Sequence, residues 1–219
     1  MTLMALGALL PVFVILFYVY VKDTRKEPFR VLITTFMLGA LAVVPAILAE
    51  LGGSFISENP FFENFLIVSP AEEGVKLFVI MIYVFSHREF DDRFDAIIYC
   101  VTASLGFAAV ENLIYTFENG IEVAILRAVT AIPGHTAFAV FMGSFVAKAK
   151  THAIYNRKEK RNKYILLAFL VPAIMHGLYD FLISIKFFWG FAALIIYSDI
   201  HSIIIVNKAS KEDRPFQQE

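Results

Sequence analysis

Cysteine is almost absent from this sequence, because Cys100 is the single one among 219 residues. One thiol cannot form a disulfide within the chain, and it cannot supply the several thiolates of a cysteine-based zinc site. Two short hydrolase motifs are also absent. The sequence has no G-x-S-x-G, which carries a serine nucleophile, and no H-E-x-x-H, which carries two zinc ligands. Any chemistry must therefore depend on other residues.

Long polar segments are scarce as well. Hydrophobic residues make up 58% of the chain, whereas an ordinary soluble domain is about 45–50% apolar. No segment is left for a soluble catalytic domain, because the excess extends over the whole length. Apolar runs long enough to cross a bilayer lie at 3–21, 30–50, 65–86, 94–117, 121–147, 163–185 and 187–206. The first run has no preceding basic residues, so we expect a retained span and not a cleaved signal peptide.

Basic residues are missing from alternate connections between these runs. Residues 51–64 and 117–121 contain no Lys or Arg, whereas the connections at 22–30, 88–93 and 148–163 and the C-terminal tail contain sixteen of the 19 basic residues. Cytoplasmic loops are enriched in Lys and Arg. This alternation therefore predicts an outer N-terminus, a cytoplasmic C-terminus and an odd number of spans.

The sequence accordingly predicts an all-α polytopic membrane protein with about seven transmembrane helices. We expect one transmembrane helical domain at 1–206, with any active site inside the membrane, and a short cytoplasmic tail at 207–219. The expected location is the plasma membrane of a prokaryote, crossed several times.

Ionisable side chains within the apolar runs are costly in hydrocarbon and usually mark a function or a buried pair. Four runs bring such groups to a similar depth in the outer half of the bilayer, which indicates a shared site. They are Glu72 and Glu73 on the third run, Glu111 on the fourth, His135 on the fifth, and His176 and Asp180 on the sixth.

Spacing along the helices adds detail to this site. Glu72 and Lys76 are four residues apart and share a helix face, as do His176 and Asp180. Glu72 and Glu73 point about 100° apart. We therefore expect one glutamate to aim at the centre, while the other orients it or pairs with Lys76. An Asp one turn from a His is well placed to hold the ring.

Each of these residues could also have a purely structural role. Ser69-Pro70-Ala71-Glu72 has the pattern of a capping box. The remaining structural roles are a neutralising pair of Glu73 with Lys76, a hydrogen-bonded core position for His135, a structural pair of His176 with Asp180, and snorkelling or ion pairing by Arg127. Asp199 and His201 lie toward the inner end, and we expect structural roles for them. We also expect Pro133-Gly134 and Pro172 to loosen their helices, and Gly106, Gly143 and Gly177 to allow close helix approach.

Carboxylates and imidazoles together can activate water. A Glu can act as general base and then as general acid, and imidazoles can orient the water or stabilise an oxyanion. The same set can hold a zinc ion while a remaining Glu acts as base. The residues favour hydrolysis in the membrane. The alternatives are a proton- or cation-coupled transporter, which uses the same residue types, and a non-catalytic scaffold.

The motifs Glu72-Glu73-x-x-Lys76, Phe107-x-x-x-Glu111 and His176-x-x-x-Asp180 resemble the series of the PrsW family of intramembrane proteases. Surrounding residues match in order from the first run through the sixth: Tyr20-x-Lys22-Asp23, Glu27-Pro28, Phe94-Asp95-Ala96-Ile97-Ile98-Tyr99, Ser104-Leu105-Gly106-Phe107-Ala108-x-x-Glu111-Asn112, Arg127-Ala128 and Val171-Pro172-x-x-x-His176-Gly177-x-Tyr179-Asp180-Phe181. The series is more distantly similar to the CAAX-prenyl-protein endopeptidases, which hold a water without metal. Glu111 stands here in place of one of their His residues, and Asp180 in place of an Asn.

This resemblance implies an endopeptidase that performs site-1 cleavage of a single-span membrane protein, typically an anti-sigma factor, at the extracytoplasmic side. We expect Glu72 to be the general base. The other expected catalytic residues are Glu73, Glu111, His135, His176 and Asp180, with Lys76, Phe107 and Asn112 in support. Two alternatives stay open: water held by side chains alone, or by a divalent metal such as zinc on Glu111, His135, His176 and Asp180. The expected partners are the substrate and the lipid bilayer, and not nucleic acid.

Overall fold

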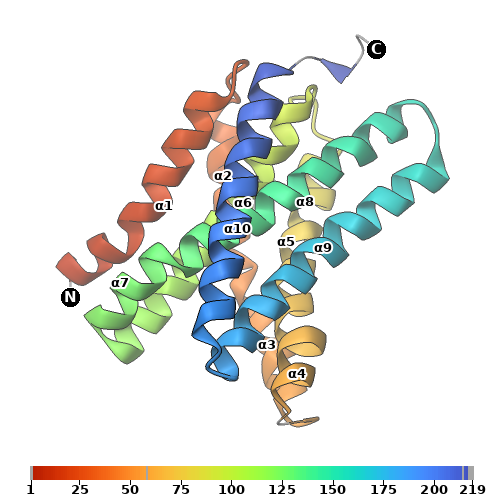
Figure 1. Ribbon diagram of the computed structural model, residues 1–219. Coiled ribbons are helices and arrows are strands. Elements are labelled where there is room, and N and C mark those ends of the chain that lie inside the picture. The colour runs from red at the N-terminus through yellow and green to blue at the C-terminus, as the bar shows by residue number, and fades with distance from the viewer. Residues whose placement is uncertain (1, 58, 214, 217–219) are drawn as a thin grey trace.

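The computed structural model describes residues 2–57, 59–213 and 215–216, and it forms a bundle of helices (Figure 1). In chain order the helices are α1 (Thr2–Lys22), α2 (Phe29–Leu41), α3 (Val43–Ser54), α4 (Pro60–Phe62), α5 (Ser69–Val79), α6 (Arg93–Asn119), α7 (Ile121–Val129), α8 (Ala131–Ile154), α9 (Lys158–Ser184) and α10 (Phe188–Lys211). Two π-helical segments, Glu63–Val68 and Ile80–Val84, flank α5 and make 60–84 one continuous helical stretch. The predicted all-α fold is confirmed, and the predicted apolar runs are mostly helical, although the second and the fifth are each divided between two helices.

Five helical stretches among the described residues are long and apolar enough to cross a membrane. They are 29–53, 93–119, 121–154, 158–184 and 188–211. Residues 7–22 of α1 form a shorter apolar helix. This is the composition of a polytopic membrane protein.

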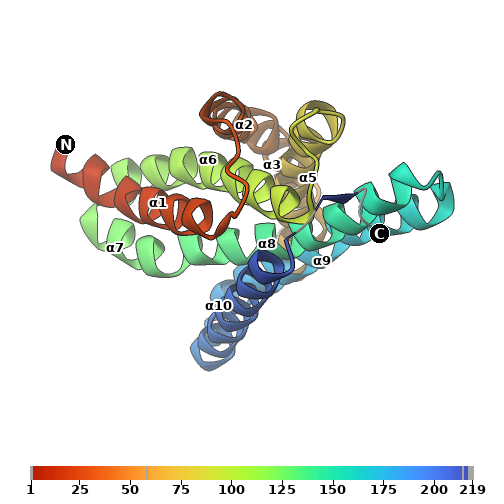
Figure 2. The same cartoon turned by 90° about the horizontal axis from the view of Figure 1, so that it is seen from above.

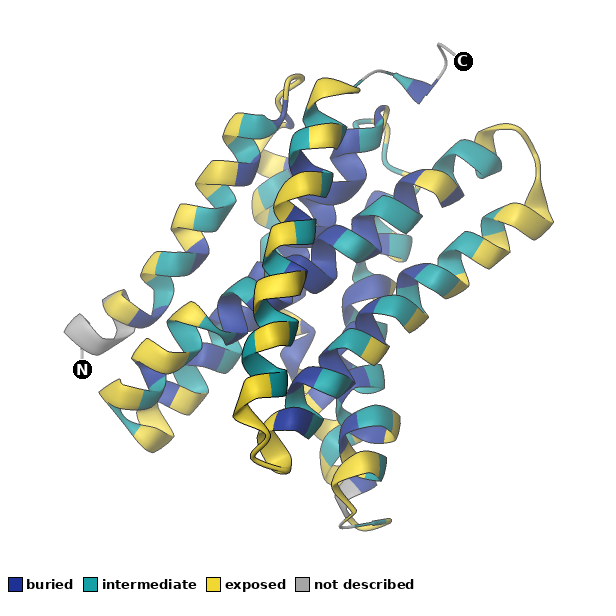
Figure 3. Cartoon of the chain, viewed as in Figure 1, coloured by how far each residue is buried: buried dark blue, intermediate teal, exposed yellow. Residues whose placement is uncertain are grey.

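Helix α6 lies at the centre of the bundle. In its apolar window 78% of the residues are buried, compared with 17% for α10. Helices α1, α2 and α8 pack against α6, and α9 packs against α8. Viewed from above, α6 and α8 lie between α2 and α10 (Figure 2). Exposed residues cover the outward sides of α1 and α10 (Figure 3), and they include large apolar side chains such as Phe17 and Trp189, as expected for helices that face lipid.

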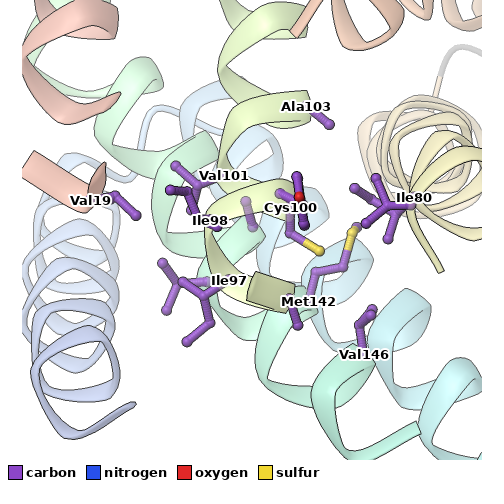
Figure 4. Close-up of a cluster of buried hydrophobic side chains, with 14 of the residues drawn as sticks. Val19, Ile80, Ile97, Ile98, Cys100, Val101, Ala103, Met142 and Val146 are labelled. Carbon is purple, nitrogen blue, oxygen red and sulfur yellow. The ribbon is translucent and has the colours of Figure 1, made fainter. Parts of the chain in front are cut away.

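The core between α6 and its neighbours contains many small and branched side chains (Figure 4), together with aromatic residues such as Phe94. Cys100 and Ile97 of α6 are buried there with Met142 of α8. Glycines let the backbones approach closely. A Cβ atom on Gly106 would lie 2.1 Å from the carbonyl oxygen of Phe36, and one on Gly143 would lie 2.7 Å from a carbonyl oxygen of α6. The predicted role of these glycines in close helix approach is confirmed.

The fifth predicted run is divided into two helices at Thr130, whose backbone angles are φ −124° and ψ −63°. Pro133 has no N–H and cannot donate to the carbonyl oxygen of Val129, so the helix breaks before it and restarts as α8. Pro172, by contrast, lies inside a continuous α9. The break places the N-terminal part of α8, which carries His135, beside α6.

A second group of buried carboxylates lies near the start of α6, in and beside the loop that follows α1. The hydroxyl of Tyr99 donates a hydrogen bond to Glu27, and Asp92 caps α6 in a capping box. Burial raises the pKa of Glu27 to about 7 and that of Asp92 to about 9. The chain after α10 returns to the same region, where the amide of Phe216 donates to the carbonyl oxygen of Asp91 at 3.0 Å.

Candidate active site

Lys76 of α5 lies at the centre of a buried polar cluster. Its Nζ atom is 3.0 Å from Oε2 of Glu72 and 2.8 Å from Oε1 of Glu73. Nδ1 of His135, on α8, lies 3.2 Å from the same Nζ. The four side chains are buried, with Lys76 only 1% exposed. Spacings of three and four residues bring the two glutamates to the lysine, so both carboxylates of α5 share one ammonium group.

The helix that carries these residues is continuous on both sides. Ser69 has helical backbone angles, and its hydroxyl has no hydrogen-bond partner among the described residues. The alternative structural role of Glu72 in a capping box is therefore excluded. The helix begins upstream, where Asn59 accepts hydrogen bonds from the amides of Phe61 and Phe62, so Glu72 is free to pair with Lys76. π-helical segments like the two that flank α5 are often found at functional sites.

His135 connects this lysine to α6. Its Nε2 atom lies 2.8 Å from Oε2 of Glu111. Because an ammonium group can only donate, Nδ1 of His135 accepts from Lys76, and the ring proton is on Nε2, which donates to Glu111. The backbone carbonyl of His135 accepts a hydrogen bond from Ser104 at 3.0 Å. His135 is thus fully hydrogen-bonded, and it lies inside the cluster.

Glu111 is held from its other side by Arg127. Oε1 of Glu111 is 2.8 Å from the guanidinium, which confirms the expected ion pairing of Arg127. Nε of Arg127 donates to Oδ1 of Asn112 at 3.2 Å, and Nδ2 of Asn112 donates to the carbonyl oxygen of Ala8 at 2.8 Å. A chain of polar contacts therefore extends from α5 through α8, α6 and α7 to α1.

His176 of α9 completes the cluster. Its Nδ1 atom lies 3.0 Å from Oε1 of Glu73, and its Nε2 atom lies 3.2 Å from Oδ2 of Asp180. The ring stacks on Phe138 with a centroid separation of 5.3 Å. Asp180 holds the imidazole from one turn along the helix, as its spacing predicted.

A cavity of about 520 Å³ adjoins the cluster, within the range of about 300–1,000 Å³ that is usual for ligand pockets. Glu72 and His176 reach its wall, whereas Glu73 does not. Phe107 also lines it, with its ring centre 4.2 Å from Nζ of Lys76. Six carboxylates line the cavity in all: Glu50, Glu63, Glu72, Glu111, Glu118 and Asp180.

The structure does not bring every predicted polar residue to this cavity, and it adds others. Asp199 lines a separate groove between α1, α8 and α10, and His201 contacts the carbonyl oxygen of Tyr197 at 2.9 Å. Sequence reasoning missed Glu50, Glu63 and Glu118. The signal for Glu50 was present, because it is the one acidic residue of the second apolar run.

Two carboxylates and two imidazoles lie close enough together to hold a metal ion. Glu72, Glu73, His135 and His176 each offer a ligand atom, and these atoms lie within 4.8 Å of one another. Oε2 of Glu73 is buried and has no hydrogen-bond partner among the described residues. Such oxygen and nitrogen donors suit zinc, so the residues fit a metal. The two remaining predicted ligands, Glu111 and Asp180, lie outside this group and contact its histidines.

Comparisons with known proteins identify the family. Residues 27–206 match the profile of the family described as PrsW family intramembrane metalloprotease. The chain is similar to Protease PrsW of Oceanobacillus iheyensis, with 40% identity over 80% of each chain. It is similar to Protease PrsW of Geobacillus kaustophilus, with 38% identity over 81% of this chain and 78% of the relative. It is also similar to Protease PrsW of Bacillus subtilis, with 34% identity over 82% of each chain. No solved structure matches. The resemblance read from the motifs is confirmed, and the chain belongs to the PrsW family of intramembrane proteases.

Proposed function

We propose that this chain makes the first, site-1 cut in a single-span membrane protein of the anti-sigma-factor class, close to the extracytoplasmic surface. The observation that carries the proposal is the position of Glu72, which reaches the cavity wall and is backed by Lys76. Membership of a protease family favours this function over the transporter that the same residue types would allow.

We also propose seven transmembrane spans, with α1 and the stretch 60–84 added to the five long apolar helices. In this arrangement the N-terminus is outside and the tail after α10 is cytoplasmic, in a bacterial plasma membrane. Two features support it. The connections rich in Lys and Arg lie at the end of the bundle where α10 finishes, at the top of Figure 1. The helix ends that carry Glu50 and Glu118 lie toward the opposite end.

Hydrolysis requires a base, a place for the developing oxyanion and an acid for the leaving group. In the proposed reaction Glu72 takes a proton from a water molecule in the cavity, and the water oxygen bonds to the peptide carbonyl carbon. The protonated Glu72 then donates this proton to the departing amine as the C–N bond breaks. Arg127 also lines the cavity, and its guanidinium has N–H groups beyond those that contact Glu111 and Asn112, which it can offer to the oxyanion.

The other residues of the cluster position these groups. Glu73 and Asp180 contact the two ring nitrogens of His176. Glu111 contacts both His135 and Arg127. Substitution of such partners lowers activity without removing a reacting atom.

For the metal-dependent form of the reaction, we propose Glu72, Glu73, His135 and His176 as the residues that would hold zinc. When bound, the ion would supply Lewis-acid activation of water. Glu111 and Asp180 would then orient the rings of His135 and His176, as carboxylates commonly do for metal-binding histidines. In the metal-free cluster, Lys76 supplies the positive charge among the same side chains.

Glu72→Gln tests the proposed base. The variant keeps the size of the side chain but cannot accept the proton, so we expect cleavage of a co-expressed single-span substrate to fall by about 10²-fold or more. Immunoblotting would follow the substrate, the product and the level of the protease. Glu122→Gln is the matched control, because Glu122 is exposed on α7 and does not line the cavity. Full cleavage by Glu72→Gln, at normal expression, would contradict the assignment.

A further inference from the structure

The cavity wall carries more negative charge than the cluster compensates. Three of its six carboxylates contact cations or imidazoles of the site: Glu72, Glu111 and Asp180. In the part of the chain that the structure describes, no cation pairs with the other three, Glu50, Glu63 and Glu118. The cavity therefore presents an excess of acceptors to whatever enters it.

The three uncompensated carboxylates come from three separate elements. Glu50 is on α3, Glu63 begins the π-helical segment before α5, and Glu118 is near the end of α6. Glu63 and Glu118 are exposed and Glu50 is half-buried. They converge on one cavity although they are distant in sequence, so the excess charge follows from the fold and not from a local acidic run.

Apolar side chains in the same cavity strengthen the effect of these carboxylates. Ile47 and Ile114 line the same cavity, and charges beside such a low-dielectric surface are screened less than charges in open water. A long side chain with a cationic head suits this surface, because its methylene groups pack on the apolar lining while the head reaches the carboxylates. Lysine and arginine are the two residues with this form.

We infer that the cavity selects a substrate segment with a lysine or arginine beside the scissile bond, with Glu50, Glu63 and Glu118 as the specificity-determining residues. This inference rests on the proposed function, because it names the kind of peptide that the proposed protease cuts. In the proposed orientation, selection for Lys or Arg distinguishes the substrate from most other membrane spans, since Lys and Arg are depleted from the outer flanks of spans.

Peptide binding tests the inference without cleavage. The probes are three nine-residue peptides with a neutral dye, identical except for a central Lys, Gln or Glu. The receptor is the purified Glu72→Gln protein in detergent, and fluorescence anisotropy gives Kd. We expect the Lys peptide to bind about tenfold or more tightly than the Glu peptide, which corresponds to about 1.4 kcal/mol, with the Gln peptide in between.

Further substitutions, made in the Glu72→Gln protein, test which residues cause the preference for the Lys peptide. A triple substitution should bring the ratio of the affinities for the Lys and Glu peptides close to one. It combines Glu50→Gln, Glu63→Gln and Glu118→Gln. Glu50→Lys should reverse the preference toward the Glu peptide, which misfolding cannot imitate. Glu122→Gln should leave the ratio unchanged. Any of three results would overturn the inference. They are equal affinities of the Lys and Glu peptides, an unchanged affinity ratio after the triple substitution, and no binding at millimolar peptide.

Cleavage of the same peptides by the wild-type protein separates this inference from the proposed function. Cleavage of the Lys, Gln and Glu peptides at equal rates would leave the protease proposal standing and remove the specificity. If the Lys peptide binds selectively but no peptide or membrane substrate is cleaved, the specificity would stand and the protease proposal would fall.

Discussion

Nζ of Lys76 lies 3.2 Å from Nδ1 of His135, and this contact fixes the tautomer of the imidazole. The ring accepts at Nδ1 and donates from Nε2 to Glu111, 2.8 Å away. One lysine thereby joins the Glu72–Glu73 pair on α5 to the Glu111–Arg127 pair of α6 and α7. The cluster behaves as one network, so a change at Lys76 should affect several helices together.

Lys76→Met should destabilise the protein strongly. The change removes the ammonium group that pairs with the buried Glu72 and Glu73, and breaking a buried ion pair in this way costs about 3–5 kcal/mol. The thermal unfolding midpoint of the purified protein in detergent would measure the loss. Lys163→Met is the control, because Lys163 is exposed near the start of α9. The double variant Lys76→Met with Glu73→Gln should recover part of the loss, which a double-mutant cycle would measure. An unfolding midpoint of Lys76→Met equal to that of the wild type would refute the account of this network.

Zinc binding should depend on His176. For the metal-dependent form, elemental analysis of the purified protein should find about one zinc per chain, and a chelator should stop cleavage. His176→Ala should lose the metal because it removes one donor of the Glu72–Glu73–His135–His176 group. His201→Ala, outside that group, should retain it. Equal zinc content in the two variants would exclude the proposed ligand set.

Gly106→Ala should loosen the packing of α2 on α6. The added Cβ would lie 2.1 Å from the carbonyl oxygen of Phe36, so the backbones must separate, at a cost of about 1–3 kcal/mol. Gly52→Ala is the matched control, since nothing lies within 4 Å of its added Cβ. Thermal unfolding should show a lower midpoint for Gly106→Ala and no loss for Gly52→Ala. Similar midpoints would mean that the close approach of α2 and α6 is not required.

Stability should fall as the pH rises through the titration of Glu27. Burial raises the pKa of this carboxyl from an ordinary value of 4.5 to about 7 in the folded protein. The folded state therefore keeps a proton that the unfolded chain releases. The associated stability is complete below about pH 4.5 and is lost as the pH rises through about 7. Burial also raises the pKa of Asp92, so the stability that Asp92 contributes is likewise lost as the pH rises.

Glu27→Gln tests this dependence, because the amide stays neutral at every pH. The unfolding midpoint of the wild-type protein should decrease more between pH 5 and pH 8 than that of the variant. The groups that face Glu27 in both proteins are Asp23, Asp92, Asp95 and Tyr99, so the difference between the two proteins reports the titration of Glu27 together with its effect on these neighbours. Equal pH dependence would show that Glu27 does not hold the extra proton.

Local spacing predicted much of the site. The Glu72–Lys76 and His176–Asp180 contacts follow from a separation of four residues in a helix, and the apolar runs located the helices. Contacts between helices could not be derived in this way, because they depend on how the helices pack. The Lys76–His135 and Glu73–His176 contacts join residues 59 and 103 positions apart.

The excluded capping box and the missed Glu50 each have a local cause. The pattern from Ser69 to Glu72 is that of a helix start, but helical structure already extends from Pro60, so the pattern lies within the helix. Glu50 was overlooked because it ends an apolar run, where an acidic residue is ordinarily solvated. Its position on the cavity wall follows from the way α3 packs beside the π-helical segment Glu63–Val68.

Cleavage in proteoliposomes tests the central claim most directly. The purified wild-type and Glu72→Gln proteins would each be reconstituted with a panel of single-span membrane proteins, and mass spectrometry would locate any new termini. The account predicts one cut by the wild-type protein, next to the span on the side opposite the basic loops, and no product with Glu72→Gln. Undiminished product with Glu72→Gln, or a cut on the side of the basic loops, would contradict it.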